Sequence, residues 1–190
     1  IASANCIRMI NASPMLCDIN SEDGSIDMNS INDNADAIIP VHIYGNPCHF
    51  DSVKSFADEQ KIPIIEDACQ AHGATYKNKK VGSISDIGCF SFYPTKNMTV
   101  GGDGGIITTN NEEIAKNVSS LRNNGRKTSN EFDKLGFTMR LNTVSAAIGR
   151  VQLRNLDDRN QRRREIVSIY RKKLAEDCVL PENKDGRSVY

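Results

Sequence analysis

The sequence predicts an α/β fold whose sheet is mostly parallel. Two short apolar runs, residues 37–43 and 62–67, are separated by a segment whose apolar residues have helical spacing. A strand, a helix and a second strand in this order normally form a parallel, right-handed crossover. Further apolar runs at residues 87–93 and 106–109 predict two more strands.

The other elements of the first half follow from spacing and from turn-forming residues. We expect a helix through residues 1–11, a short strand at 14–19, and a polar loop with a short helix across residues 20–36. Asp51 should open the helix that joins the first two strands of the sheet. The apolar side chains of that helix, at Val53 and its helical neighbours, should face the core.

Two more helices are expected in the second half of the chain. Asn110 should cap a helix that ends near Asn123. A long helix should begin at Asn142 or Thr143 and continue to about Leu174. Its arginines alternate with acidic residues and lack an aromatic platform, which favours a solvated helix face over a nucleic-acid surface.

Composition excludes several classes of partner. The 190 residues carry 24 basic and 24 acidic side chains, so no overall charge favours nucleic acid or an anionic membrane. No apolar run is long enough to span a bilayer. The six cysteines form no CxxC pair, which favours reduced thiols over a disulfide framework or a zinc site. We therefore expect a cytoplasmic protein without a metal.

The chain is expected to be a fragment. It lacks an initiating Met, and Arg8 and several polar residues interrupt the apolar positions near its start, so a signal peptide is not predicted. Residues 176–190 resemble the passage into another subdomain. We therefore divide the chain into residues 1–175 and residues 176–190.

Two groups with complementary chemistry follow neighbouring strands. Asp67 ends the strand at 62–67, and Lys96 comes just after the strand at 87–93. Open α/β sheets bind ligands at the carboxyl ends of their strands. A lysine can form a Schiff base with an aldehyde cofactor, while a carboxylate keeps the cofactor's pyridine nitrogen protonated. Spacing alone also allows Asp67 to be a simple helix cap.

Several ordered motifs strengthen this hypothesis. They are IPVHIYGNP at Ile39–Pro47, EDACQAHGA at Glu66–Ala74, FSFYPTKN at Phe90–Asn97, GGDGG at Gly101–Gly105, and RLN at Arg140–Asn142. Over essentially the whole chain they resemble the nucleotide-sugar aminotransferases of the DegT/DnrJ/StrS family. The resemblance implies the three-layer α/β/α large domain of the PLP-dependent transferase fold type I, incomplete at its N-terminus, over residues 1–175. The C-terminal small domain would begin at residues 176–190.

The resemblance also implies roles for single residues. Lys96 would form the Schiff base with pyridoxal 5'-phosphate, and Asp67 would pair with the pyridine nitrogen. Gln70 would lie near the cofactor ring's hydroxyl, and the hydroxyl of Ser91 would contact the cofactor phosphate. Arg140 would approach a substrate phosphate or the partner subunit's site.

Three features of the sequence have less definite roles. His72 fits a place beside the site and a place in the core equally well. Thr138 stands where the family often has an Asn that reaches the cofactor phosphate across the dimer, although a hydroxyl can also donate to phosphate. Gly101–Gly105 lacks the GxGxxG order of nucleotide loops, so we expect it to form a tight turn near Lys96.

The implied activity is transamination in two half-reactions. An amino donor, glutamate in this family, would load the cofactor while Lys96 moves the proton, and the amino group would then pass to a nucleotide-linked keto sugar. The sites of the family are completed across a homodimer. One alternative is a sugar dehydratase of the same family, in which histidine replaces the lysine, so Lys96 argues against it. The other is a non-enzymatic binding or regulatory domain on the same fold.

Overall fold

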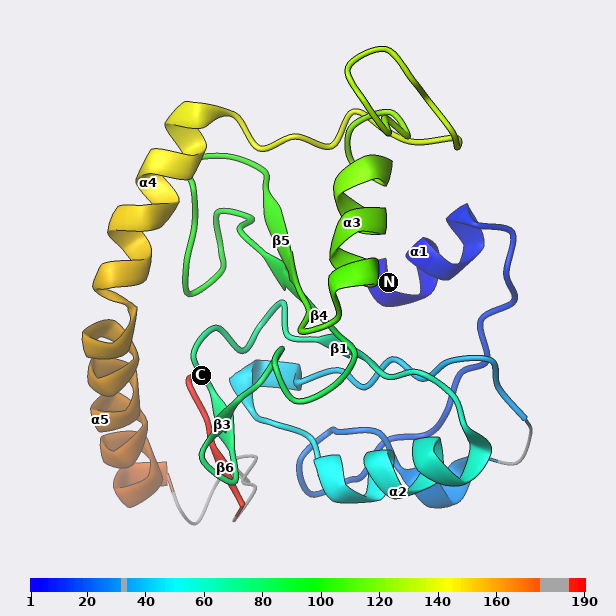
Figure 1. Ribbon diagram of the computed structural model, residues 1–190. Helices are drawn as coiled ribbons and strands as arrows, with labels where there is room; N and C mark the ends of the chain where they lie inside the picture. Colours follow the sequence, from blue (N-terminus) through cyan, green and yellow to red (C-terminus); the bar gives the residue numbers. More distant parts are fainter. Residues whose placement is uncertain (32–33, 175–184) are drawn as a thin grey trace.

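The described part of the chain forms two small sheets with helices around them (Figure 1). The computed structural model describes residues 1–31, 34–174 and 185–190. The chain starts with helix α1 (Ala2–Met9), close to the predicted helix at residues 1–11. Across the described residues, no helix combines the length and apolar character needed to cross a membrane.

The central sheet contains β1 (Ile65–Asp67), β4 (Ile87–Ser91) and β5 (Gly105–Thr108), in the order β1-β4-β5. β1 and β4 are parallel, whereas β5 runs antiparallel to β4. The strands predicted at residues 62–67 and 87–93 are confirmed with shorter bounds, and the strand predicted at 106–109 is confirmed with a shift of one residue. Because β1 and β4 are parallel, their carboxyl ends meet at one edge of the sheet.

The predicted strand at residues 37–43 lies beside β1 without forming a continuous strand. Isolated parallel bridges join Ile38 to Ile64 and Val41 to Asp67. Between them, the carbonyl of Pro40 accepts a hydrogen bond from the Asp67 N–H at 2.9 Å. Pro40 has no N–H to return, and this interrupts the ladder. The predicted parallel arrangement is confirmed.

Helix α2 (Phe50–Gln60) connects these segments and covers β1. It begins one residue before Asp51, which lies in its first turn. Val53 and Ala57 are buried in a cluster with Ile38 and Ile64, so the predicted apolar face of the helix is confirmed. This packing fixes the position of β1 and of the carboxylates at its end.

The predicted strand at residues 14–19 is wrong. Only Ile19 forms a bridge, with Ile26, and the side chains of Met15 and Leu16 are exposed. The apolar pattern of this segment therefore does not reflect burial in the sheet. The short helix expected in the following loop is η1 (Met28–Ser30).

Helix α3 (Glu112–Leu121) starts and ends slightly differently from the prediction. Asn111, and not Asn110, is the cap, because its side-chain oxygen accepts hydrogen bonds from the first turn, namely from the N–H groups of Glu113 (2.9 Å) and Ile114 (3.2 Å). The helix ends at Leu121, two residues before the predicted end at Asn123.

The long helix predicted to Leu174 is two helices, α4 (Thr143–Arg154) and α5 (Leu156–Leu174). Its predicted start is confirmed, since the Asn142 side chain caps α4. The break falls at Asn155, whose side-chain amide donates to the carbonyl of Val151 at 2.9 Å. That bond replaces the backbone hydrogen bond that would continue the helix.

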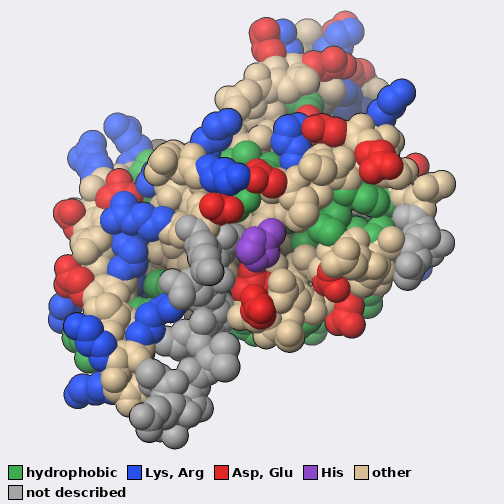
Figure 2. Space-filling model, turned by 90° about the horizontal axis from the view of Figure 1, so that it is seen from below, with side chains coloured by type: hydrophobic (Ala, Val, Ile, Leu, Met, Phe, Trp, Pro, Cys, Tyr) green, Lys and Arg blue, Asp and Glu red, His purple; other side chains and the backbone are tan. Residues whose placement is uncertain are grey.

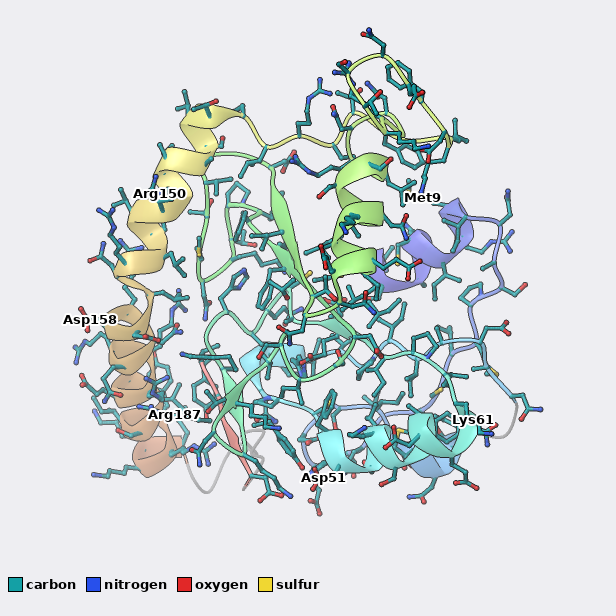
Figure 3. All side chains as sticks on the ribbon, viewed as in Figure 1. Met9, Asp51, Lys61, Arg150, Asp158 and Arg187 are labelled. Atoms are coloured by element: carbon teal, nitrogen blue, oxygen red, sulfur yellow. The ribbon has the colours of Figure 1, made fainter. Side chains whose placement is uncertain are left out.

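Charged side chains of both signs line α5. Figure 2 shows lysine and arginine side chains along one side of the molecule with acidic side chains among them. Arg162 pairs with Glu165 at 3.0 Å within the helix, and Lys80 reaches Asp157 at 3.2 Å. Asp158 points away from the sheet (Figure 3), as expected for a solvated face.

A second sheet brings the end of the chain back onto the fold. It consists of β3 (Lys79–Lys80), β2 (Thr75–Tyr76) and β6 (Gly186–Arg187), with β2 antiparallel to both neighbours. Most of the segment predicted to open a small domain, residues 176–184, lies outside the described residues. The domain boundary therefore stays a prediction.

Candidate active site

Four of the five predicted site residues lie at or just beyond the carboxyl ends of β1 and β4. Asp67 is the last residue of β1 and pairs in register with Cys89 of β4. Ser91 is the last residue of β4. Beyond it the chain makes a turn in which the Lys96 N–H donates to the carbonyl of Tyr93 at 2.9 Å, leaving Lys96 half-buried.

The charges of Asp67 and Lys96 both act on the thiol of Cys69. Burial and, after it, the hydrogen bond and charge of the Asp67 carboxylate together raise the pKa of this thiol to about 12, against a smaller opposing effect of the Lys96 ammonium. The Cys69 N–H also donates to Asp67 at 3.1 Å. Cys69 therefore lies next to Asp67 at the edge of the sheet where β1 and β4 end.

The Asp67 carboxylate is fixed by two hydrogen bonds to its two oxygens. Cys69 N–H bonds Oδ1, and the hydroxyl of Ser3 in α1 donates to Oδ2 at 2.8 Å. Bonds of this kind to a carboxylate are stronger than those between neutral groups. Ser3 was missed by the sequence reasoning, since nothing in the pattern of α1 indicates contact with a residue 64 positions away.

Gln70 and Ser91 have structural contacts within this chain. The side-chain oxygen of Gln70 accepts a hydrogen bond from the Tyr44 N–H at 2.9 Å, in the short helix η2 (Ile43–Gly45). The Ser91 hydroxyl oxygen accepts from the Tyr93 N–H at 3.2 Å. These contacts hold both side chains at the same edge of the sheet as Asp67.

The contacts of Arg140 place it near the end of α3 and not at this edge of the sheet. It is exposed, and its guanidinium donates to the side-chain oxygen of Asn123 at 2.6 Å, just beyond α3. The Thr138 hydroxyl donates to the side chain of Asn124 at 2.7 Å in the same region. Both residues thus belong to a surface loop near the end of α3 (Figure 1), and their roles toward a partner subunit stay predictions.

His72 is buried beside Phe90 of β4 and Phe92, which follows that strand. Its ring lies 5.4 Å from the ring of Phe90 and 6.0 Å from that of Phe92, measured between centroids. Within the described residues, neither ring nitrogen has a hydrogen-bond partner. Burial, with a smaller contribution from the Lys96 charge, lowers the pKa of His72 to about 4, although the backbone of Ser91 opposes this shift. At neutral pH this side chain adds no charge next to Lys96.

Replacing His72 with leucine will flatten the pH dependence of stability. The folded protein keeps His72 neutral down to its pKa of about 4, whereas the unfolded chain takes up the proton below the ordinary value of 6.5. Wild-type stability should therefore be complete above pH 6.5 and decrease as the pH falls toward 4, because the unfolded state binds more protons. The test is to measure the urea midpoint of both proteins between pH 4 and pH 6.5. An equal change of midpoint with pH in the two proteins would contradict the prediction.

Known proteins resemble this chain in both sequence and fold. The profile of the DegT/DnrJ/EryC1/StrS aminotransferase family matches residues 1–187. The chain belongs to this family. The resemblance seen in the motifs is thereby confirmed, as is the α/β fold class.

Relatives in the DegT/DnrJ/EryC1/StrS family include sugar transaminases. The dTDP-3-amino-3,4,6-trideoxy-alpha-D-glucose transaminase of Streptomyces venezuelae is 40% identical over 139 residues, 73% of this chain and 37% of that protein. The GDP-perosamine synthase of Caulobacter vibrioides is 38% identical over 181 residues, 92% of this chain and 48% of that protein. A pleiotropic regulatory protein of Geobacillus stearothermophilus is 35% identical over 194 residues, 98% of this chain and 52% of that protein.

A solved structure of the family covers the whole chain. DesV of S. venezuelae, determined in complex with a ketimine intermediate, superposes with a TM-score of 0.95 at 34% identity. The match covers 100% of this chain and 53% of that chain. The chain therefore spans about half the length of its relatives, which agrees with the expectation that it is a fragment.

Glu66 is a fully buried carboxylate of this DegT/DnrJ/EryC1/StrS chain, and the sequence pattern did not assign it a role. Glu66 lies in β1, and its side chain is fully buried against the loop that follows β3. Its donors are the His42 ring (3.0 Å), the N–H groups of Gly82 (2.6 Å), Ile84 (2.9 Å) and Ser85 (3.0 Å), and the Ser85 hydroxyl (2.9 Å). The His42 Nδ1 accepts from the Cys48 N–H at 3.1 Å, so its Nε2 carries the proton that is donated to Glu66.

The hydrogen bonds decide the charge of Glu66. Burial alone would raise the pKa of its carboxyl, but the bonds from His42 and from the backbone of Gly82 outweigh burial, so the pKa is lowered. Successive side chains of a strand point to opposite faces, so Glu66 and Asp67 cannot both face one ligand. The alternation places the two carboxylates on opposite faces of the strand, and the burial of Glu66 among its donors shows that Glu66 is the one in the core.

Proposed function

We infer that the protein containing this chain is a pyridoxal phosphate-dependent aminotransferase. It would transfer an amino group, with glutamate as the donor, to a keto sugar carried on a nucleotide. The observation that carries this proposal is that Asp67 ends β1 and Lys96 follows β4, because these two parallel strands end at the same edge of the sheet. Family membership and the sugar transaminases among the relatives support it.

The side chains at this edge suit the chemistry of the cofactor. Pyridoxal phosphate supplies an aldehyde for a lysine and a protonated ring that acts as an electron sink. Lys96 offers the amine and Asp67 offers a carboxylate for the ring nitrogen. Ser91 offers a hydroxyl for the phosphate, and Gln70 lies on the same edge for the ring's hydroxyl. The donor set of the chain therefore fits this group.

Lys96 has a second role in proton transfer, and its neighbours hold the site in place. Once its amine is free, Lys96 would carry a proton to and from the substrate carbon as a general base and acid. Ser3 and Cys69 keep the Asp67 carboxylate in place. The His72 ring is buried and, with its pKa lowered to about 4, adds no competing charge at neutral pH.

A cytoplasmic homodimer with shared sites completes the proposal. Arg140 and Thr138 lie on an exposed loop, where they are available to a second subunit. Five cysteines within the described residues are free thiols, which suits a reducing compartment. In such a dimer, Arg140 would reach a substrate phosphate at the partner's site.

A regulatory domain on the same fold is the second candidate. It is favoured by the relative that is named as a pleiotropic regulatory protein and shares 35% identity with this chain. A regulator would not need an amine placed to react with an aldehyde. Covalent uptake of the cofactor therefore distinguishes the two candidates.

The test uses the complete protein that contains this chain. Incubation with pyridoxal phosphate, reduction with borohydride and peptide mass mapping should find the cofactor attached to Lys96. A Lys96→Ala variant should lose the adduct, whereas Lys116→Ala, which changes an exposed lysine of α3, should keep it. The protein is then assayed with glutamate and a panel of nucleotide-linked keto sugars, following 2-oxoglutarate. A folded protein that forms no adduct at Lys96 would exclude the enzyme and favour the regulatory domain.

A further inference from the structure

The residues that end the described chain are inserted into the fold beside the candidate active site. Val189 is completely buried, and its N–H donates to the carbonyl of Gly45 at 3.0 Å. The Ser188 hydroxyl donates to the buried side chain of Asn46 at 2.7 Å. Residues 188–190, here called the strap, are therefore fixed on one side to the turn at residues 43–46.

Asn97 fixes the other side of the strap. Its side-chain amide donates to the carbonyl oxygens of Val189 at 3.1 Å and Tyr190 at 3.2 Å. Asn97 directly follows Lys96, and both belong to the short turn that starts at Tyr93. The strap therefore holds the turn that carries the lysine.

On its opposite side, the strap is bonded to the turn that also contacts Gln70, another predicted site residue. The turn at residues 43–46 contains Tyr44, whose N–H is bonded by the side chain of Gln70. Contact here is close, since a Cβ on Gly45 would lie 2.6 Å from the Tyr190 nitrogen, and Gly45 has φ +76°. The strap thus connects the Lys96 turn with the turn that holds Gln70.

Helix α5 holds the strap from outside. The guanidinium of Arg163 donates to the Tyr190 carbonyl at 3.2 Å. Arg187, at the end of β6, points toward α5 (Figure 3) and donates to the side chain of Gln161 at 3.2 Å. These contacts limit the movement of the strap, so that Asn97 is bonded to a fixed partner.

We propose that Asn97 is a positioning residue, which orients Lys96 by bonding its turn to the strap. The role rests on the proposed function of Lys96. The Asn97 amide is the side chain that joins the Lys96 turn to Val189 and Tyr190 in the described contacts. Without it, the lysine would sample orientations in which its amine misses an aldehyde seated between Lys96 and Asp67. Errors of about 1 Å in such placement slow a reaction by roughly 100-fold.

Two variants of Asn97 separate positioning from simple loss of packing. Asn97→Ala removes the amide, and Asn97→Asp keeps the shape but places an oxygen where the amide donated to two carbonyl oxygens. Asn111→Ala is the matched control, because it also removes an asparagine side chain that makes two backbone bonds, at the cap of α3. Thermal unfolding of each variant of the complete protein shows that the proteins compared are folded.

The first measurement needs no cofactor. Hydrogen exchange followed by mass spectrometry should show faster exchange in the peptide that covers residues 93–97, where the Lys96 N–H is bonded to Tyr93. Both Asn97 variants should show this increase, and Asn111→Ala should not. Unchanged exchange in the Asn97 variants would overturn the role of the strap, whether or not the protein proves to be an aminotransferase.

The second measurement is the rate at which Lys96 is trapped by pyridoxal phosphate and borohydride. We expect this rate to fall about 10- to 100-fold in both Asn97 variants and to stay at the wild-type value in Asn111→Ala. Trapping at the wild-type rate in the Asn97 variants would overturn the positioning role while leaving the proposed function intact. A wild-type protein that forms no adduct would overturn the proposed function and, with it, the role of Asn97 toward the lysine.

Discussion

Replacing Lys96 with arginine will reduce aminotransferase turnover by about 10²- to 10⁴-fold, the range attributed to a positioned acid–base group. Arginine keeps a positive charge in the half-buried turn. Its guanidinium stays protonated and cannot supply a free amine to an aldehyde or carry a proton from carbon. The loss should appear in kcat with glutamate and the best nucleotide-linked keto sugar found in the panel.

The control for this variant is the same lysine-to-arginine substitution at an exposed site. Lys116→Arg on α3 should leave turnover unchanged, because Lys116 pairs only with Glu112 on the helix surface in the described contacts. Near-ultraviolet circular dichroism establishes that Lys96→Arg keeps the native fold. Turnover close to wild type in Lys96→Arg would show that Lys96 is not the reacting amine.

Replacing Glu66 with glutamine will lower the free energy of unfolding by about 3–5 kcal/mol, the typical cost of removing one partner from a buried charged interaction. The shape of the side chain is kept, but its new amide group faces the N–H of Gly82 and the ring N–H of His42. Donors then oppose donors in a place without water, and each unmade bond carries the cost of desolvation. Urea unfolding at neutral pH measures the change.

The effect of Glu66 also has a definite pH dependence. Because its pKa is lower in the folded protein than its ordinary value of 4.5, its contribution is complete above pH 4.5 and decreases as the pH falls through the lowered value. Glu66→Gln should lack this part of the acid sensitivity. Glu165→Gln, on the exposed face of α5, should show no measurable change in stability at neutral pH. Equal urea midpoints for Glu66→Gln and wild type would contradict the structural role of Glu66.

The sequence was sufficient to predict the edge of the sheet where the site lies. The apolar run that ends at Asp67 and the run before Lys96 both form strands, and these are parallel as expected. Helical spacing of apolar residues also predicted the start of α4, where the structure adds a cap from the Asn142 side chain to the N–H of Ser145. Such features depend on neighbours in the sequence, which a pattern can reveal.

Features that depend on distant residues were missed. Nothing near Ser3 indicates that its hydroxyl reaches Asp67, and nothing near residues 188–190 indicates that they bond Asn97. The break at Asn155 was also missed, because helical spacing of apolar residues continues through it while the side chain bonds the preceding turn. Contact partners of this kind are settled by the whole fold.

The protonated state of Cys69 has a consequence for chemical selectivity at this edge. Reagents such as maleimides and iodoacetamide attack the anionic form of sulfur, and this thiol, with a pKa of about 12, offers almost none of it at neutral pH. Alkylating agents will therefore react slowly with Cys69 and also with Cys89 beside Asp67, since the pKa of the Cys89 thiol is raised to about 11 chiefly by burial.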